Sequence, residues 1–213
     1  MKYDRLRILF GEDFEKFKNT KILLLGVGGV GTFCLDCLYR SGITDITIVD
    51  FDTFDVTNQN RQMHSELHEG ESKVEGLWWH YTTTTTIDKK IDVEWVESFD
   101  FEPYDIILDA IDDFEPKIAL IQKCHKKMIS SMGSAKKMDP TKIEVIDVFE
   151  THGDKFASKI RAELRKREFK GRLTTIFSSE EPLCKEKGSF VGVTGAFGLA
   201  MCAETIKQII NKN

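Results

Sequence analysis

The 213-residue sequence has four prolines, five cysteines and no long apolar run. An odd number of scattered cysteines argues against the disulfide framework of small secreted proteins. Residues 189–203 are apolar, but this stretch is shorter than the ~20 residues that span a bilayer. The opening residues, MKYDRLRILFGED, interrupt their apolar side chains with charges, unlike a secretory signal or a membrane anchor. We therefore expect a cytoplasmic protein without a membrane partner.

The chain also lacks the two CxxC pairs that hold a structural zinc ion in many proteins. Cys34 and Cys37 form a single CxxC, and the other three cysteines are scattered along the sequence. This pair falls inside a stretch that should form a helix packed on a sheet. Two buried small side chains are therefore the favoured interpretation.

Basic side chains are in the minority, because the formal net charge is −5. Residues 155–172 nevertheless hold eight basic and two acidic side chains, a local charge of +6 that leaves −11 for the rest of the chain. A basic strip on an acidic body suits a polyanionic partner such as nucleic acid. The residues alone favour an ordinary solvated helix face, with polyanion binding as the alternative.

What the sequence does contain is a glycine-rich segment, LLLGVGGVG, at residues 23–31. Glycines at these positions allow a tight turn between a strand and a helix, and they let backbone N–H groups face an anion. The glycines concerned are Gly26, Gly28, Gly29 and Gly31. Asp50 follows 19 residues after Gly31 at the end of an apolar strand, where a ribose-binding carboxylate is expected. The unit predicts a pocket for a nucleoside phosphate.

A glycine turn alone most often indicates NAD or FAD binding, but further polar residues favour a different chemistry. Those on the following loop are Asp52, Asn58, Arg61 and Gln62. A guanidinium near phosphates suits displacement at phosphorus, because negative charge builds on the oxygens in the transition state. Lys73 can supply a second cation, and Asp112 ends an apolar strand where a phosphate-bridging metal would sit. These residues favour ATP chemistry over hydride transfer.

The order of apolar runs predicts an α/β fold, a Rossmann-like doubly wound and mostly parallel sheet with a C-terminal β/α extension. The expected parallel strands are residues 21–25, 46–50, 93–96, 106–109 and 128–132. Two further strands bracket the basic helix at residues 143–149 and 173–177. Within that helix Ala157, Ile160 and Leu164 form an apolar stripe, so we expect the basic side chains to point outward.

We expect residues 1–213 to form a single domain, since this length can bury one core. Its expected parts are a nucleotide-binding core at about residues 19–140, a basic-helix extension at about 141–190 and a closing helix at about 195–211.

One stretch fits this plan poorly. Five successive threonines follow the segment GLWWHY, and their β-branched side chains lower helix propensity. We expect a frayed helix end at this place. Trp78 and Trp79 are expected to pack in the core or in a small lobe rather than stack on bases, and His80 to be a surface or packing residue.

Taken together, the motifs resemble a known superfamily. GxGGxG, the DFD strand end, NxxRQ, the lysine of the next helix and the DAxD strand end are similar to those of ubiquitin-activating, ThiF and MoeB enzymes. Within it, MGSAKKMDPTKIEVIDVFETHGDKFASKIRAELRKR followed by FSSEEP resembles the tRNA threonylcarbamoyladenosine dehydratases, also called TcdA or CsdL. The resemblance extends over residues 3–210.

This resemblance implies an ATP- and Mg²⁺-dependent enzyme. Its members adenylate a carboxylate, and in this branch the carboxylate belongs to threonylcarbamoyladenosine (t6A) at tRNA position 37, which then cyclises (to ct6A) with release of AMP and pyrophosphate. The implied ATP contacts are Gly26, Gly28, Gly29, Gly31, Asp50, Asp52, Asn58, Arg61, Gln62, Lys73 and Asp112, with Mg²⁺ on Asp112. The implied catalytic residues are Arg61, Lys73, Asp112 and Arg5.

The resemblance also implies partners. Arg5 matches an arginine that reaches the ATP site of the neighbouring subunit, so we expect a homodimer. The candidate tRNA contacts are Lys136, Lys137, Lys159, Arg161, Arg165, Lys166 and Arg167. A sulfur-transfer protein is a further possible partner.

Two alternatives stay open. The chain could adenylate the C-terminus of a ubiquitin-like sulfur-carrier protein, as ThiF and MoeB do, although the missing zinc pairs and the basic helix count against this. It could also be a noncatalytic nucleotide-binding subunit, but the presence of Arg61, Lys73 and Asp112 argues otherwise.

Overall fold

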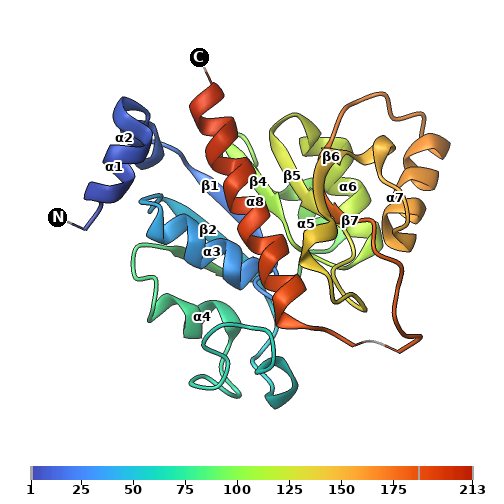
Figure 1. The fold of residues 1–213 in the computed structure, drawn as a ribbon, viewed down its shortest axis with the longest axis horizontal. Coiled ribbons are helices and arrows are strands. Elements are labelled where there is room, and N and C mark those ends of the chain that lie inside the picture. The colour runs from blue at the N-terminus through green and yellow to red at the C-terminus, as the bar shows by residue number, and fades with distance from the viewer. Residues whose placement is uncertain (1, 187, 213) are drawn as a thin grey trace.

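The computed structural model describes residues 2–186 and 188–212, in which one mixed sheet is covered by helices on both faces (Figure 1). The strand order is β3-β2-β1-β4-β5-β7-β6, and only β6 runs antiparallel to its neighbour. The strands are β1 (Ile22–Leu25), β2 (Ile46–Asp50), β3 (Thr85–Asp88), β4 (Ile106–Asp109), β5 (Met128–Ser131), β6 (Ile143–Asp147) and β7 (Thr174–Ser178). The expected Rossmann-like class is confirmed.

The chain winds outward from β1 in both directions. It passes from β1 to β2 and β3 on one side, and then to β4 and β5 on the other, so Leu25 of β1 pairs with both Val49 and Asp109. In such sheets a ligand binds outside the carboxyl ends of the strands, where the direction of winding reverses. That point lies between β1 and β4.

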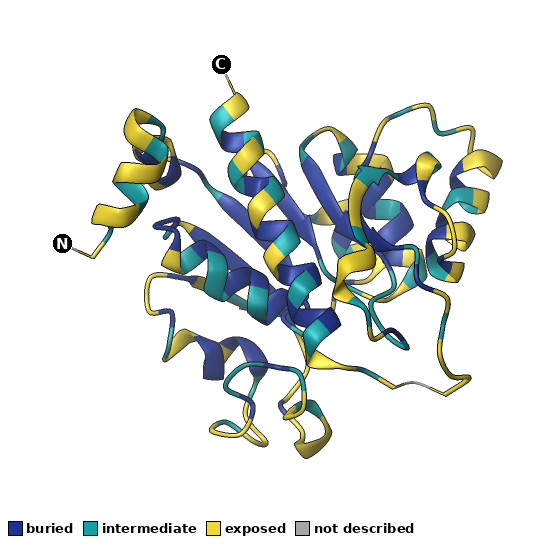
Figure 2. Ribbon diagram, in the orientation of Figure 1, coloured by how far each residue is buried: buried dark blue, intermediate teal, exposed yellow. Residues whose placement is uncertain are grey.

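Alternate residues of the buried strands serve two separate cores, because successive side chains point to opposite faces. One core packs Leu24 and Ile48 against α2 (Phe14–Lys18), α3 (Gly31–Arg40), α4 (Lys73–Trp78) and α8 (Val191–Asn211). The other packs Leu23 and Val49 against α5 (Val93–Ser98), α6 (Phe114–Cys124) and α7 (Lys155–Lys166). Figure 2 shows the buried sheet between exposed outer helix faces, with α1 (Asp4–Phe10) largely exposed.

The closing helix, expected at 195–211, is α8, and it lies unusually close to α3. A Cβ atom added at Gly198 would stand 2.4 Å from the carbonyl oxygen of Val30 and 2.8 Å from the amide nitrogen of Cys34. Only glycine permits this approach. No helix among the described residues is long and apolar enough to cross a membrane.

Two expectations about residues 78–96 were wrong. Residues 93–96 belong to helix α5, which Asp92 caps by accepting a hydrogen bond from the Trp95 amide at 2.9 Å. The third parallel strand on this side is instead β3, which begins within the threonine run; its β-branched side chains suit an edge strand. Trp78 and Trp79 are 40% and 67% exposed, so they do not pack in the core.

Residues 53–72 form the crossover segment between β2 and α4. A cluster of histidine side chains attaches this segment to the residues that follow α4. The His64 ring stacks on His80 with centroids 3.7 Å apart, and the Nε2 atoms of His68 and His80 lie 2.9 Å apart. His64 Nε2 also lies 3.2 Å from the Tyr81 hydroxyl, which donates to Asp36 of α3. His80 is therefore a packing residue, as expected.

This arrangement is stable when the rings are neutral. Burial, and then the neighbouring His80, lowers the pKa of His64, although Glu66 and Asp36 act in the opposite direction. Burial, and then His68, likewise lowers the pKa of His80, while Glu66 raises it. Two protonated rings stacked face to face would repel each other.

Acidification should therefore loosen the crossover segment. In the unfolded chain the histidine pKa is near 6.5. As the pH falls from about 7.5 to about 5.5, the unfolded state therefore binds more protons than the folded cluster, in which the histidine pKa values are lower. The free energy of unfolding then decreases. A His64→Asn variant keeps a residue that tolerates the positive φ of 67° at this position. It should lose less Tm than wild type over this pH range.

The matched control is His152→Asn, since the side chain of His152 is 64% exposed. Thermal denaturation followed by circular dichroism at both pH values gives the comparison. An equal loss of Tm in wild type and His64→Asn would show that the cluster does not sense pH.

Candidate active site

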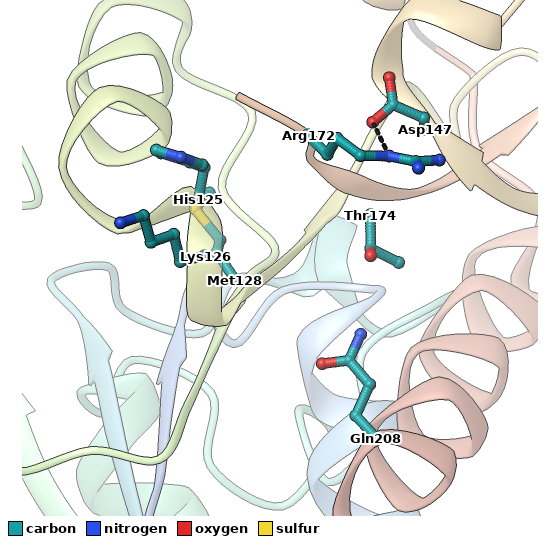
Figure 3. Close-up of a pocket in the computed structure, with 7 residues that line it drawn as sticks. All are labelled: His125, Lys126, Met128, Asp147, Arg172, Thr174 and Gln208. Carbon is teal, nitrogen blue, oxygen red and sulfur yellow. Dashed lines mark ion pairs between the residues drawn. The ribbon is translucent and has the colours of Figure 1, made fainter. Parts of the chain in front are cut away.

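A cavity of about 1110 Å³ lies over the carboxyl ends of β1, β2, β4 and β5, at the predicted point of reversal. The glycine turn, the crossover segment and residues 131–136 line it. A smaller hollow of about 530 Å³ lies at the opposite edge, where β5 and β7 begin (Figure 3). Arg172 there pairs with Asp147 at 3.8 Å, and Gln208 of α8 faces them. It contains none of the predicted nucleotide-binding residues.

The glycine turn depends on absent side chains. Gly26 has a φ of 84°, and a Cβ atom there would lie 3.0 Å from the carbonyl oxygen of Ala110. At Gly31 an added Cβ would lie 2.0 Å from the Gly26 oxygen, which no adjustment of a side chain could relieve. The turn therefore closes tightly, and α3 begins at Gly31 with its N-terminus toward the cavity. Such an N-terminus attracts phosphate.

Asp50 fixes the turn to the end of β2. Its Oδ2 accepts the Val27 amide at 2.8 Å and its Oδ1 accepts the Asp52 amide at 2.9 Å, while the residue as a whole is only 8% exposed. A carboxylate oxygen has more than one acceptor site, so these bonds leave capacity for ribose hydroxyls. Asp50 thus caps the strand end and still lines the cavity.

Two cations face the same cavity. Lys73, the first residue of α4, places Nζ 2.8 Å from Asp52 Oδ2, and its side chain is 6% exposed. Arg61 donates through Nη1 to the carbonyl oxygen of Thr57 and to Asn60 Oδ1. These two acceptors are neutral, and among the described residues no carboxylate pairs with Arg61, so its positive charge is available to a phosphate. Asp52 therefore forms its ion pair with Lys73 rather than with Arg61.

The amide side chains of the crossover segment complete this wall. Asn58 Oδ1 accepts the Asp55 amide at 3.1 Å, which holds a short 3-10 turn (Val56–Asn58). Gln62 is 6% exposed, and its Oε1 has no hydrogen-bond partner among the residues that the structure describes. A buried acceptor without a donor costs about 1–3 kcal/mol. An unpaired amide oxygen at the cavity is suited to a donor on a bound nucleotide.

Asp112 and Asp113 follow β4 and are exposed at the cavity. Mg²⁺ is commonly bound by one or two carboxylates together with substrate phosphates. The donor chemistry at Asp112 therefore fits the predicted metal.

Sequence reasoning missed a buried ion pair beneath these residues. Lys117 Nζ lies 2.5 Å from Asp109 Oδ2, and both side chains are fully buried. The ammonium also donates to Ser130 Oγ and to the Ser131 carbonyl oxygen. Burial lowers the pKa of Lys117, opposed by Asp109. The pair joins the ends of β4 and β5. In the sequence, the signal that could have predicted it is the presence of the polar residues Asp109 and Lys117 in otherwise apolar runs.

Lys136 lines the far wall of the cavity and Lys137 does not, although both were predicted to contact tRNA. The side chain of Lys137 is 2% exposed, with Nζ 2.9 Å from Asp154 Oδ2 and 2.6 Å from the Ser178 carbonyl oxygen. The prediction for Lys137 was wrong, because its ammonium is already enclosed. Lys136 is half-buried, has a φ of 67° and donates from Nζ to the Lys185 carbonyl oxygen.

The basic helix is α7, and its apolar stripe of Ala157, Ile160 and Leu164 is buried as expected. The basic side chains of α7 that are predicted to contact tRNA differ in how exposed they are. Lys159, Arg165 and Lys166 are exposed. Arg161 is half-buried and donates to the Thr151 hydroxyl, and Arg167 donates from Nε to Glu163 at 2.8 Å.

Arg5 lies elsewhere. It is exposed on α1 and lines a separate hollow together with Asp36, Arg40 and Leu199. Within the described part of the chain, therefore, the structure brings together all of the predicted nucleotide-binding residues except Gly31, which is buried behind the turn, while Arg5 stands apart.

Comparison with known proteins agrees with this geometry. The tRNA threonylcarbamoyladenosine dehydratase of Bacillus subtilis (strain 168) is 38% identical over 185 residues, covering 81% of this chain and 72% of that protein. The molybdopterin-synthase adenylyltransferase of Haemophilus influenzae is 27% identical over 218 residues, covering 97% of this chain and 83% of that protein. The crystal structure of Escherichia coli TcdA in complex with ATP matches with a TM-score of 0.93 at 30% identity, covering 99% and 94% of the two chains.

A model of the ThiF family matches residues 3–213. Given this match over almost the whole sequence, together with the fold and the arrangement of the cavity, the protein belongs to the ThiF family.

Proposed function

We propose that this protein is an ATP-dependent tRNA threonylcarbamoyladenosine dehydratase. The observation that carries the proposal is a single cavity that joins a nucleotide site to the first turn of a basic helix, because Asp50, Arg61 and Phe156 of α7 all line it. The Bacillus subtilis dehydratase, at 38% identity, and the Escherichia coli dehydratase structure, at 30% identity, support the same activity.

The chemistry begins with a carboxylate, which is a poor electrophile. Attack of the threonylcarbamoyl carboxylate on the α-phosphorus of ATP forms an acyl-adenylate and expels pyrophosphate. Intramolecular attack on the activated carbonyl then closes a ring and expels AMP, with the net loss of one water from the nucleoside. No cysteine nucleophile is needed, which suits a chain where Cys34, Cys124 and Cys202 are buried.

The protein's contribution is alignment and charge stabilisation. Asp50 would hold the ribose, and the turn at Gly28 and Gly29 would face the phosphates. Arg61 and Lys73 would stabilise the negative charge that develops during displacement, and Asn58 would donate through its amide group. Mg²⁺, held by Asp112, would neutralise phosphate charge when bound.

The partners follow from the same proposal. A homodimer would bring Arg5 to the ATP site of the neighbouring chain, and a sulfur-transfer protein is a further candidate. A tRNA substrate supports our expectation of a cytoplasmic protein. The alternative substrate is the C-terminus of a ubiquitin-like sulfur carrier, which the exposed cations of α7 disfavour.

The first prediction tests the substrate. Purified protein with ATP, Mg²⁺ and tRNA that carries threonylcarbamoyladenosine should release AMP and pyrophosphate. Mass spectrometry of the digested tRNA should detect a nucleoside lighter by one water. Equal ATP consumption with unmodified tRNA, or consumption only with a sulfur-carrier protein, would rule out this function.

A second prediction concerns α7. Changing Arg165 and Lys166 together to glutamate should weaken tRNA binding and flatten its salt dependence, because fewer counterions are released on binding. ATP affinity should persist. The control makes the same charge change at Lys207 and Lys212, whose side chains are 69% and 61% exposed on α8 and just beyond it. If both double variants showed the wild-type salt slope, α7 would be only a solvated helix.

The third prediction concerns a shared site. Arg5→Ala and Arg61→Ala should each be nearly inactive, because each removes phosphate-stabilising charge from every site of a homodimer. A mixed heterodimer assembles one site with both arginines, so up to about half of wild-type activity should return if the sites act independently. Arg7→Ala, on the same helix, is the control and should stay active. Verified heterodimers without activity would place Arg5 outside the shared site.

A further inference from the structure

The cavity has two halves, and each half is lined by residues that follow a different strand. On one side Asp50 ends β2, and Phe51 and Ile91 lie beside it. On the other side residues 131–135 follow β5, and Phe156 projects from the first turn of α7. Figure 1 shows α4 and α7 on opposite sides of the sheet.

A nucleotide held by Asp50 and the glycine turn would leave the second half free. Three strand spacings separate β2 from β5, which corresponds to about 14 Å at ~4.8 Å per spacing. The volume of about 1110 Å³ also exceeds the ~300–1,000 Å³ typical of a site for one small ligand. The half beside β5 and α7 is therefore available to the second reactant.

Phe156 is held firmly in this second half. Lys117 Nζ lies over its ring, 6.0 Å from the centroid, and Lys117 is fully buried. One ring face is thus turned toward the protein interior, while the half-buried side chain also lines the cavity. Across from it, a Cβ atom at Gly133 would come within 3.4 Å of the Phe156 Cβ. A glycine at this point gives the side chain its space.

The backbone beneath Phe156 is equally fixed. Asp154 caps α7, with Oδ1 accepting the Ala157 amide at 2.6 Å. Its Oδ2 pairs with the buried Lys137. A side chain fixed in this way loses little conformational entropy when a ligand packs on it.

We propose that Phe156 is the stacking platform for the purine base of the tRNA substrate, a site that rests on the proposed function. Proteins recognise bases in single-stranded RNA loops by stacking them on aromatic side chains. The exposed cations of α7 continue from Phe156 along the same helix, where they can contact backbone phosphates. Phe51, the other aromatic residue of the cavity, belongs to the ATP half beside Asp50. The two reacting nucleosides thus each have an aromatic neighbour.

The experiment uses an anticodon stem-loop RNA with 2-aminopurine in place of the adenosine that would be modified. Stacking on Phe156 should quench the fluorescence of 2-aminopurine. Phe156→Leu should abolish most of the quenching and weaken RNA binding about 5- to 100-fold, as loss of one stacking contact predicts. Phe156→Trp should retain both, and ATP affinity should be unchanged in every variant.

The matched control is Phe99→Leu, because Phe99 is a half-buried phenylalanine that packs on the same core as α7 but does not line the cavity. Wild-type quenching and affinity in Phe156→Leu would overturn the proposal, as would equal losses in Phe99→Leu. A loss of ATP affinity in Phe156→Leu would also overturn it, by assigning the ring to packing or to the ATP half.

Turnover of modified tRNA by the wild-type protein is measured in parallel. Its absence contradicts the proposed function, independently of the fluorescence result. If wild type is active, kcat/KM for modified tRNA should fall in Phe156→Leu by the factor by which binding weakens.

Discussion

The burial of Lys117 against Asp109 is the constraint on which the candidate site depends. A charged pair in a dry interior is tolerated only when its remaining hydrogen-bonding capacity is used, and Ser130 and the Ser131 carbonyl provide this. A well-packed apolar pair can be as stable as a buried ion pair, so stability alone does not account for it. Its geometric effect is specific: it ties the ends of β4 and β5, from which Asp112 and the wall at residues 131–136 emerge.

The two walls of the cavity are held by different kinds of contact. On the β5 side, Lys117 and Lys137 are both enclosed, and their carboxylate partners anchor β4 and α7. On the β2 side, the crossover segment is anchored by the buried Phe54 and by half-buried histidines, while Val56 and Leu67 are 57% and 66% exposed. Partly exposed segments open at a lower free-energy cost than fully buried ones. The wall that carries Arg61 is therefore the one better suited to adjust around ATP, while the opposite wall offers a fixed surface.

The predicted nucleotide-binding residues lie together at one edge of the sheet because their sequence signals are local. The glycine turn, Asp50 and Asp112 are each placed by a strand end, and parallel strands bring such ends to one edge. Prediction failed where other residues of the chain determine whether a side chain is buried or which secondary structure a segment forms. Lys137 looked like a surface lysine, yet Asp154, 17 residues further on, encloses it. Residues 93–96 are apolar enough for a strand, but the Asp92 cap makes them a helix and leaves the strand to the threonine run.

The two halves of the cavity also come from separate parts of the chain. Residues 26–112 supply the glycine turn, Asp50, Arg61, Lys73 and Asp112, whereas residues 131–194 supply the wall beside α7. A fold of this kind can therefore keep its ATP chemistry while the second half changes to accept another carboxylate. In this chain that half adjoins the basic helix, whose segment carries a charge of +6 against −11 for the rest, so a polyanion would be attracted to this side of the molecule. Under the proposed function, the charge distribution and the two-part cavity would therefore favour the same substrate, a nucleoside carried on a polyanion.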